Sequence, residues 1–86
     1  EQGKFDAIII DGDHTYKATM HNVCSLLPSL TSKGCMILHD IYTSAQMKAC
    51  WDDLCAMKEF TLCVDGFDFG LLFTDIALVK TQYRLK

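Results

Sequence analysis

The chain has 86 residues, of which 50% are hydrophobic and 22% are charged, a balance that is ordinary for a globular domain. This length allows one small domain with a modest core. The formal net charge of −3 and the absence of a basic cluster argue against nucleic acid as a partner. No apolar run approaches the roughly 20 residues of a membrane helix, so a membrane partner is not expected either.

Five cysteines are many for a chain of this length, and their number is odd. None of them forms a C-x-x-C pair. The pattern favours reduced cysteines that behave as small hydrophobic core residues, over a disulfide framework or a zinc site. Reduced cysteines in turn indicate a cytoplasmic location.

The first predicted elements are a strand and a helix. Phe5–Ile10 is almost continuously apolar, which is typical of a strand that is covered on both faces. From Tyr16 the period changes to that of an amphipathic helix, whose start either Asp13 or Thr15 could cap. Pro28 is expected to kink or break its last turns. The apolar stripe of this helix consists of Met20, Val23, Cys24, Leu27 and Leu30.

A second strand and a second helix follow. Ser32-Lys33-Gly34 predicts a turn, in which Gly34 can take a positive φ angle, and Cys35–Leu38 predicts another buried strand. Thr43-Ser44-Ala45-Gln46 has the form of a capping box. Behind it lies a helical stripe made of Met47, Cys50, Trp51, Leu54 and Met57.

The last part of the chain predicts two more strands. Phe60–Val64 alternates like a strand, Gly66 and Gly70 indicate a turn region, and Ile76–Val79 reads as the final strand. The order β-α-β-α-β-β predicts an α/β fold with parallel strands joined by right-handed crossovers. The last two strands are joined too tightly for a crossover, so they are expected to form an antiparallel hairpin.

Two groups of polar residues stand directly after the two predicted buried strands. The first group is Asp11-Gly12-Asp13-His14, and the second is His39-Asp40. Open parallel α/β sheets bind their ligands outside the carboxyl ends of the strands. If the two strands are neighbours, both groups face one crevice, which makes this edge the candidate functional site.

Several of these residues also have simpler interpretations. Asp13 can serve as a helix cap, His14 as a solvated loop histidine, and His39-Asp40 as a turn after a strand. Asp11 is the hardest to dismiss, because a carboxylate directly after a run of isoleucines needs strong partners. His21 lies within the first predicted helix and is expected at the surface without a role.

The spacing Asp11-x-Asp13-x-Thr15 after an apolar strand resembles the first motif of haloacid dehalogenase-type phosphatases. In that family the first aspartate is the nucleophile and the second is a general acid/base, with Mg²⁺ between them and the phosphate. The resemblance is local. An amphipathic helix begins at once in this chain, and no later strand ends in the Ser or Thr that the family requires.

The segments "FDAIIIDGDHTY", "LLPSLTSKG" and "CMILHD", with the closing "FDFGLLFTDIALVK", resemble a longer pattern. It is that of the C-terminal half of a class I, Rossmann-like, S-adenosylmethionine-dependent methyltransferase of the small-molecule O-methyltransferase type. The resemblance implies that residues 1–86 are a single partial domain. The glycine-rich cofactor loop and the acidic residue that binds the cofactor ribose would lie before Glu1. Such a half-domain is expected to bind the cofactor weakly and to expose a strand edge that favours self-association.

The resemblance also implies roles for the polar residues. Asp11 and Asp40 would bind Mg²⁺, Asp11 would also lie beside the cofactor's methionine moiety, and His14 would be the general base for a small-molecule acceptor. Relatives often have an acidic residue where this chain has His39, which becomes a third candidate metal ligand. A mechanism without metal that relies on His and Asp stays open. The rival from another class is a catalytically silent α/β fragment or interaction module.

Overall fold

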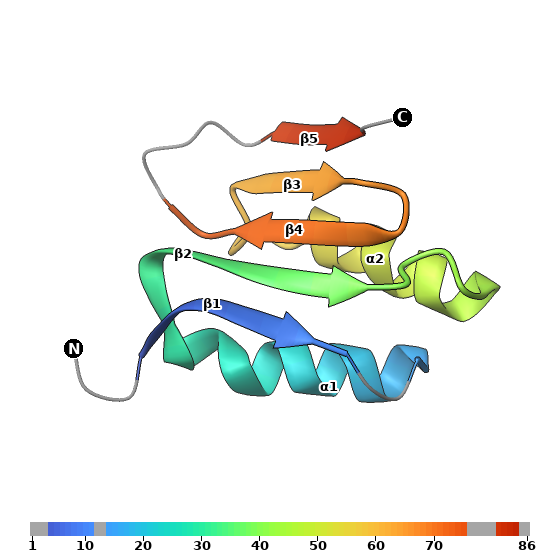
Figure 1. Cartoon of the computed structure of the whole chain (residues 1–86), viewed down its shortest axis with the longest axis horizontal. Helices are drawn as coiled ribbons and strands as arrows, with labels where there is room; N and C mark the ends of the chain where they lie inside the picture. Colours follow the sequence, from blue (N-terminus) through green and yellow to red (C-terminus); the bar gives the residue numbers. More distant parts are fainter. Residues whose placement is uncertain (1–3, 12–13, 76–80, 85–86) are drawn as a thin grey trace.

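A computed structural model describes residues 4–11, 14–75 and 81–84 and shows an α/β fold with one mixed sheet (Figure 1). The strands lie in the order β1-β2-β4-β3-β5. Neither helix of this described part has the length and apolarity needed to cross a bilayer. The elements in chain order are β1 (Phe5–Ile10), α1 (Tyr16–Leu26), the 3₁₀ turn η1 (Leu27–Ser29), β2 (Leu30–His39), α2 (Ala45–Ala56), β3 (Leu62–Asp65), β4 (Phe69–Phe73) and β5 (Thr81–Arg84).

The sheet matches the predicted strand directions only in part. β1 and β2 are parallel, and so are β3 and β5, but β4 runs antiparallel to both of its neighbours. A hairpin is present, and β3 and β4 form it. Gly66 lies in the turn between these strands, as predicted, but Gly70, which was also expected to indicate a turn, lies inside β4. The predicted last strand, Ile76–Val79, lies outside the described residues.

Gly70 shows why the turn prediction failed. It lies inside β4, where a Cβ atom would come within 2.5 Å of two ring atoms of Trp51. The residue is therefore glycine because a tryptophan packs against the strand, and no turn is needed to explain it.

Both helices begin at a side-chain cap. The Ala18 amide donates to Thr15 Oγ1 over 3.2 Å, and the Met47 amide donates to Ser44 Oγ over 3.2 Å. Thr15 is thus one of the two predicted caps of α1. The capping box predicted from Thr43 to Gln46 was wrong, because the cap lies one residue later and the Gln46 side chain is used elsewhere.

The connection between α1 and β2 confirms one prediction and corrects another. α1 ends before Pro28, which lies in the 3₁₀ turn, as the missing amide of proline requires. β2 begins at Leu30, so the predicted turn at 32–34 lies inside a strand whose register against β1 shifts. Gly34 is buried, and a Cβ there would lie 2.9 Å from the Asp6 carbonyl oxygen, so close strand approach explains this glycine.

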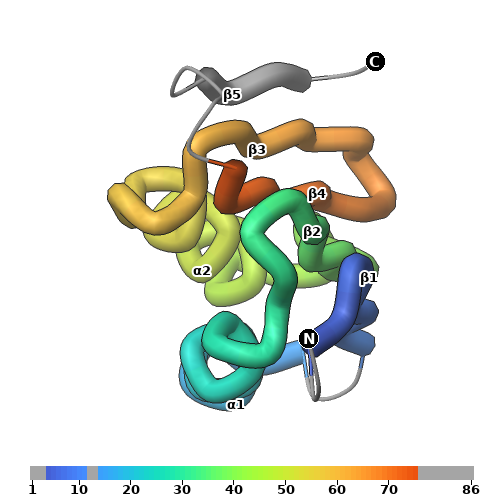
Figure 2. Tube along the Cα trace, turned by 90° about the vertical axis from the view of Figure 1, so that its left-hand side faces the viewer, coloured from blue at the N-terminus to red at the C-terminus, as the bar shows by residue number. Residues whose placement is uncertain are grey.

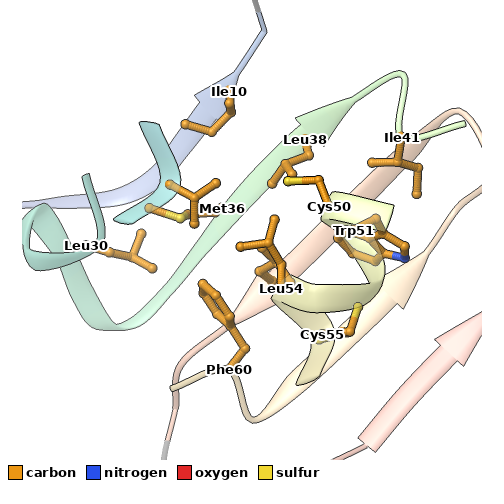
Figure 3. Packing of buried hydrophobic residues seen from close by; sticks show 13 residues of the cluster. Ile10, Leu30, Met36, Leu38, Ile41, Cys50, Trp51, Leu54, Cys55 and Phe60 are labelled. Atoms are coloured by element: carbon orange, nitrogen blue, oxygen red, sulfur yellow. The ribbon is translucent and has the colours of Figure 1, made fainter. Parts of the chain in front are cut away.

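The core lies between the helices and one face of the sheet, and both helices cover that same face (Figures 2 and 3). Trp51, with 1% of its surface exposed, is the largest buried side chain, so the prediction that it fills the space between helix and sheet is confirmed. The remaining buried hydrophobic residues are Ile10, Val23, Leu30, Met36, Leu38, Ile41, Met47, Cys50, Leu54, Cys55, Phe60, Cys63 and Leu72.

All five cysteines are free, and three of them are buried. The three buried cysteines, Cys50, Cys55 and Cys63, act as small core hydrophobes, as the sequence pattern favoured, whereas Cys24 is exposed and Cys35 is half-buried. Burial, reinforced by the negative charge of Asp53, raises the pKa of the Cys50 thiol from 9.0 to about 11.

This shift predicts a loss of stability at alkaline pH. Above pH 9 the unfolded chain releases the Cys50 proton while the folded chain keeps it until about pH 11, so the free energy of unfolding falls as pH rises between these values. One such group lowers the free energy of unfolding by at most about 1.4 kcal/mol for each pH unit. Denaturant titrations across this range test the prediction. In the Cys50→Ala variant, the free energy of unfolding should depend less on pH in this range. If it depends on pH as strongly as in the wild type, the effect does not come from Cys50.

Both helices of the described residues lie on one face of the sheet, and neither of them covers the second face, which corrects the prediction that Phe5–Ile10 is covered on both faces (Figure 2). Phe5 is 57% exposed and Ile9 is 68% exposed. Alternation explains this, since Ile10 at the opposite face is buried. β1 is also the terminal strand of the sheet, so it combines a free edge with exposed apolar side chains.

We therefore expect the chain to self-associate through β1, because an apolar edge strand is a template for pairing with a second copy. Ile9→Lys should raise the dissociation constant about tenfold or more, since burial of an isoleucine side chain contributes about 1.5 kcal/mol or more. Sedimentation velocity over a concentration series measures the effect. Leu26→Lys, at an exposed leucine on α1, is the matched control. Equal effects of both substitutions would show that β1 is not the contact.

Candidate functional site

The two predicted polar groups meet at one edge of the sheet. β1 and β2 are neighbouring parallel strands, with Ile10 paired to Leu38, so their carboxyl ends lie side by side (Figure 1). Asp11 follows β1, His39 is the last residue of β2, and Asp40 follows it. This geometry brings Asp11, His14, His39 and Asp40 together, as expected if the two strands are neighbours. Asp13 lies outside the described residues.

The four side chains form a compact mixed cluster. His14 Nε2 lies 3.6 Å from Asp11 Oδ1 and 3.8 Å from Asp40 Oδ2. His39 Nδ1 lies 3.7 Å from Asp11 Oδ1 and 3.2 Å from Asp40 Oδ2. Two carboxylates thus surround two imidazoles, with N···O distances between 3.2 and 3.8 Å.

His14 is the most enclosed group of the cluster. Its Nε2 atom is buried and has no hydrogen-bond partner among the described residues, although about a third of the side chain is exposed. A buried ring nitrogen without a partner is costly in free energy. Its lone pair or proton is therefore available to a group that enters the site.

The start of α1 fixes the position of His14. Thr15 caps the helix, and the next amide, that of Tyr16, donates to Gln46 Oε1 over 2.8 Å. The Tyr16 hydroxyl donates to Asp53 Oδ2 over 2.5 Å, and this hydrogen bond, with desolvation, raises the pKa of Tyr16. These bonds join the first turn of α1 to α2, so α2 holds the loop that carries His14. The sequence offered no signal for the role of Gln46.

Asp40 has an unusual backbone conformation. Its φ angle is +58°, in the left-handed region that favours glycine. The Asp40 amide donates to the Asp68 carbonyl oxygen over 2.8 Å, so the turn between β3 and β4 holds the residue in place. Glycine would adopt this conformation at lower cost, so the aspartate here is a candidate functional residue.

Replacement of Asp40 by glycine should separate stability from function. The left-handed conformation costs a non-glycine residue about 1 kcal/mol, so Asp40→Gly should leave the free energy of unfolding unchanged or raise it by up to that amount. Activity at the site should fall about 10- to 1,000-fold, the range for loss of one charge-stabilising group. Asp40→Ala should lose the same activity and be less stable than Asp40→Gly. Equal activity of wild type and Asp40→Gly would exclude Asp40 from the site.

A pocket of about 190 Å³ adjoins Asp40. Its walls include Tyr42 and Phe67, whose rings stack with their centroids 5.6 Å apart, and the Tyr42 hydroxyl donates to buried Asp65. Sequence reasoning missed this pocket, because Phe67 comes from the β3–β4 turn, which was interpreted only as turn chemistry. The complete lining is Asp40, Tyr42, Thr43, Phe67 and Asp68.

The cluster fits Mg²⁺ poorly. Magnesium demands near-octahedral oxygen coordination and usually one or two carboxylates with several waters. Here two imidazole nitrogens stand between the two carboxylates, where oxygen ligands would be needed. The phosphatase interpretation also loses support, because Thr15 is engaged as the cap of α1.

Residues 1–41 match the model of a protein family described as a methyltransferase domain. The segment is just under half of the 86 residues, and it includes β1, α1, β2 and all four side chains of the cluster. No curated protein and no solved structure matches the chain. The match supports a methyltransferase domain in the part of the chain that carries the cluster.

Proposed function

We propose that the chain carries the acceptor side of an S-adenosylmethionine-dependent O-methyltransferase that acts on a small molecule, within a Rossmann-like domain. The observation that carries the proposal is the meeting of Asp11, His14, His39 and Asp40 at the carboxyl ends of two neighbouring parallel strands. Ligands of open α/β sheets bind at this edge. The family match to residues 1–41 supports the same reaction class.

His14 is the proposed general base. Methyl transfer to a hydroxyl requires that the acceptor oxygen be held in line with the methyl group and that its proton be removed. The unpartnered Nε2 atom of His14 can accept this proton. Asp11 and Asp40, 3.6 and 3.8 Å away, stabilise the imidazolium that results.

S-adenosylmethionine, when bound, supplies the methyl group from a sulfonium centre. The exposed Asp11 carboxylate at the end of β1 suits the ammonium group of its methionine moiety. No step is assigned to Mg²⁺, because the two imidazoles do not fit that ion. The pocket beside Asp40, which has aromatic walls, is the proposed binding site of the acceptor.

Transfer of a labelled methyl group by the complete protein tests the proposal. Phenols, sugars and carboxylic acids are offered as acceptors, and we expect a labelled ether from at least one hydroxyl-bearing class. Asp11→Asn should abolish most of this transfer. If the complete protein is active and both Asp11→Asn and His14→Ala leave the activity unchanged, the cluster is not the site. Absence of transfer and of cofactor binding would favour the interaction module.

A further inference from the structure

The donor atoms of the cluster match a different class of metal ion from Mg²⁺. Asp11, His14 and His39 each offer one ligand atom, and these three atoms all lie within 4.8 Å of one another. Imidazole nitrogens suit Zn²⁺, Ni²⁺ and other borderline transition ions, whereas Mg²⁺ prefers oxygen. Two nitrogens and one carboxylate oxygen therefore select against the harder ion.

The distances agree with this interpretation. Neighbouring ligands of a tetrahedral ion with bonds of about 2.1 Å lie about 3.4 Å apart. The two imidazole nitrogens lie 3.6 and 3.7 Å from Asp11 Oδ1, close to this spacing, and all three ligand atoms lie within 4.8 Å of one another. Asp40 Oδ2 lies next to this group, 3.2 Å from His39 Nδ1 and 3.8 Å from His14 Nε2.

The His14 nitrogen provides a second, independent observation. Its Nε2 atom is buried and lacks a hydrogen-bond partner among the residues that the structure describes. The neighbouring carboxylate oxygens are too distant and poorly placed to satisfy it, at 3.6 and 3.8 Å. A metal bond would satisfy this nitrogen without any rearrangement of the backbone.

We propose that Asp11, His14 and His39 bind a borderline divalent transition ion such as Zn²⁺, Co²⁺ or Ni²⁺ in preference to Mg²⁺. The consequence for activity rests on the proposed function. In the proposed function, His14 Nε2 takes the proton from the hydroxyl group that is methylated. A metal ion bound to the same nitrogen competes with this proton. The bound ion is then an inhibitor of methyl transfer, which a chelator relieves.

Titration with Co²⁺, followed by its visible absorption and by calorimetry, tests the binding directly and needs no enzymatic activity. The titrations use a Cys24→Ser background, because Cys24 is an exposed thiol that could bind the ion. We expect one Co²⁺ per chain, and a large excess of Mg²⁺ should not displace it. His14→Ala and His39→Ala should each weaken binding at least about 10- to 100-fold, a loss that even outer-shell partners produce.

Two further variants make the result decisive. His21→Ala, the matched histidine on the exposed side of α1, should bind Co²⁺ as the parent does. His39→Asp exchanges nitrogen for oxygen at a half-exposed position and should shift preference from Co²⁺ towards Mg²⁺. Unchanged binding by His14→Ala, equal losses in His21→Ala, or displacement by Mg²⁺ would each overturn the metal site. Tight Co²⁺ binding without any methyl transfer would refute the proposed function and leave the site standing.

Discussion

Replacement of His14 by alanine is expected to lower the rate of methyl transfer about 10²- to 10⁴-fold, the range that a positioned general base contributes. The expectation follows from a ring nitrogen that is buried, unpartnered in the described part of the chain, and placed between two carboxylates. The loss should appear in kcat, because the base acts on the proton in the transition state, while the KM for the cofactor changes little. Single-turnover rates with labelled cofactor measure it.

His21→Ala is the matched control for this substitution. His21 lies on α1, the helix that follows His14. It is exposed, and its ring nitrogen Nε2 lies 3.4 Å from Ser25 Oγ. It should retain wild-type kcat. A loss confined to KM in His14→Ala would assign His14 to binding, and full activity would remove it from the mechanism.

Truncation of Trp51 to alanine is expected to have the largest effect on stability. Loss of a fully buried aromatic side chain costs about 3–5 kcal/mol. Domains of this kind are stable by only about 5–15 kcal/mol in total. The Trp51 ring is 1% exposed and lies against Gly70 of β4, so its removal opens a cavity between α2 and the sheet (Figure 3). Chemical denaturation followed by circular dichroism measures the difference in the free energy of unfolding between the wild type and Trp51→Ala.

Two companion variants identify the physical cause. Trp51→Phe should cost much less than alanine, because the indole Nε1 has no hydrogen-bond partner among the described residues and none is lost. Gly70→Ala should destabilise the wild type, where the new Cβ would lie 2.5 Å from the ring. The same change should be almost neutral in a Trp51→Ala background, since the clash is gone. Additive effects would show that the two residues do not share this contact.

The site could be predicted from the sequence because its cause is local. Asp11 and His39-Asp40 each follow an apolar run, and parallel strands bring such ends together whatever the rest of the sheet does. The stripe of α2 was equally clear, since Met47, Cys50, Trp51 and Leu54 recur with the helical period and are all buried.

The features that the sequence did not reveal depend on distant partners. β4 was missed because Gly70 looks like a turn residue until the Trp51 ring is placed against it. The exposed face of β1 was missed because a continuous apolar run has no period that distinguishes a covered strand from an edge strand. The bond from Tyr16 to Gln46 spans thirty positions of the chain and leaves no local pattern.

The apolar face of the sheet that neither α1 nor α2 covers also affects how the free energy of unfolding changes with temperature and denaturant. The heat capacity change and the denaturant dependence of unfolding both scale with the surface that unfolding exposes. A sheet covered on one side alone already exposes residues such as Ile9, so both quantities should fall below the average for a chain of this length. Its stability curve against temperature is therefore expected to be shallow, and any layer that covers this face should steepen it.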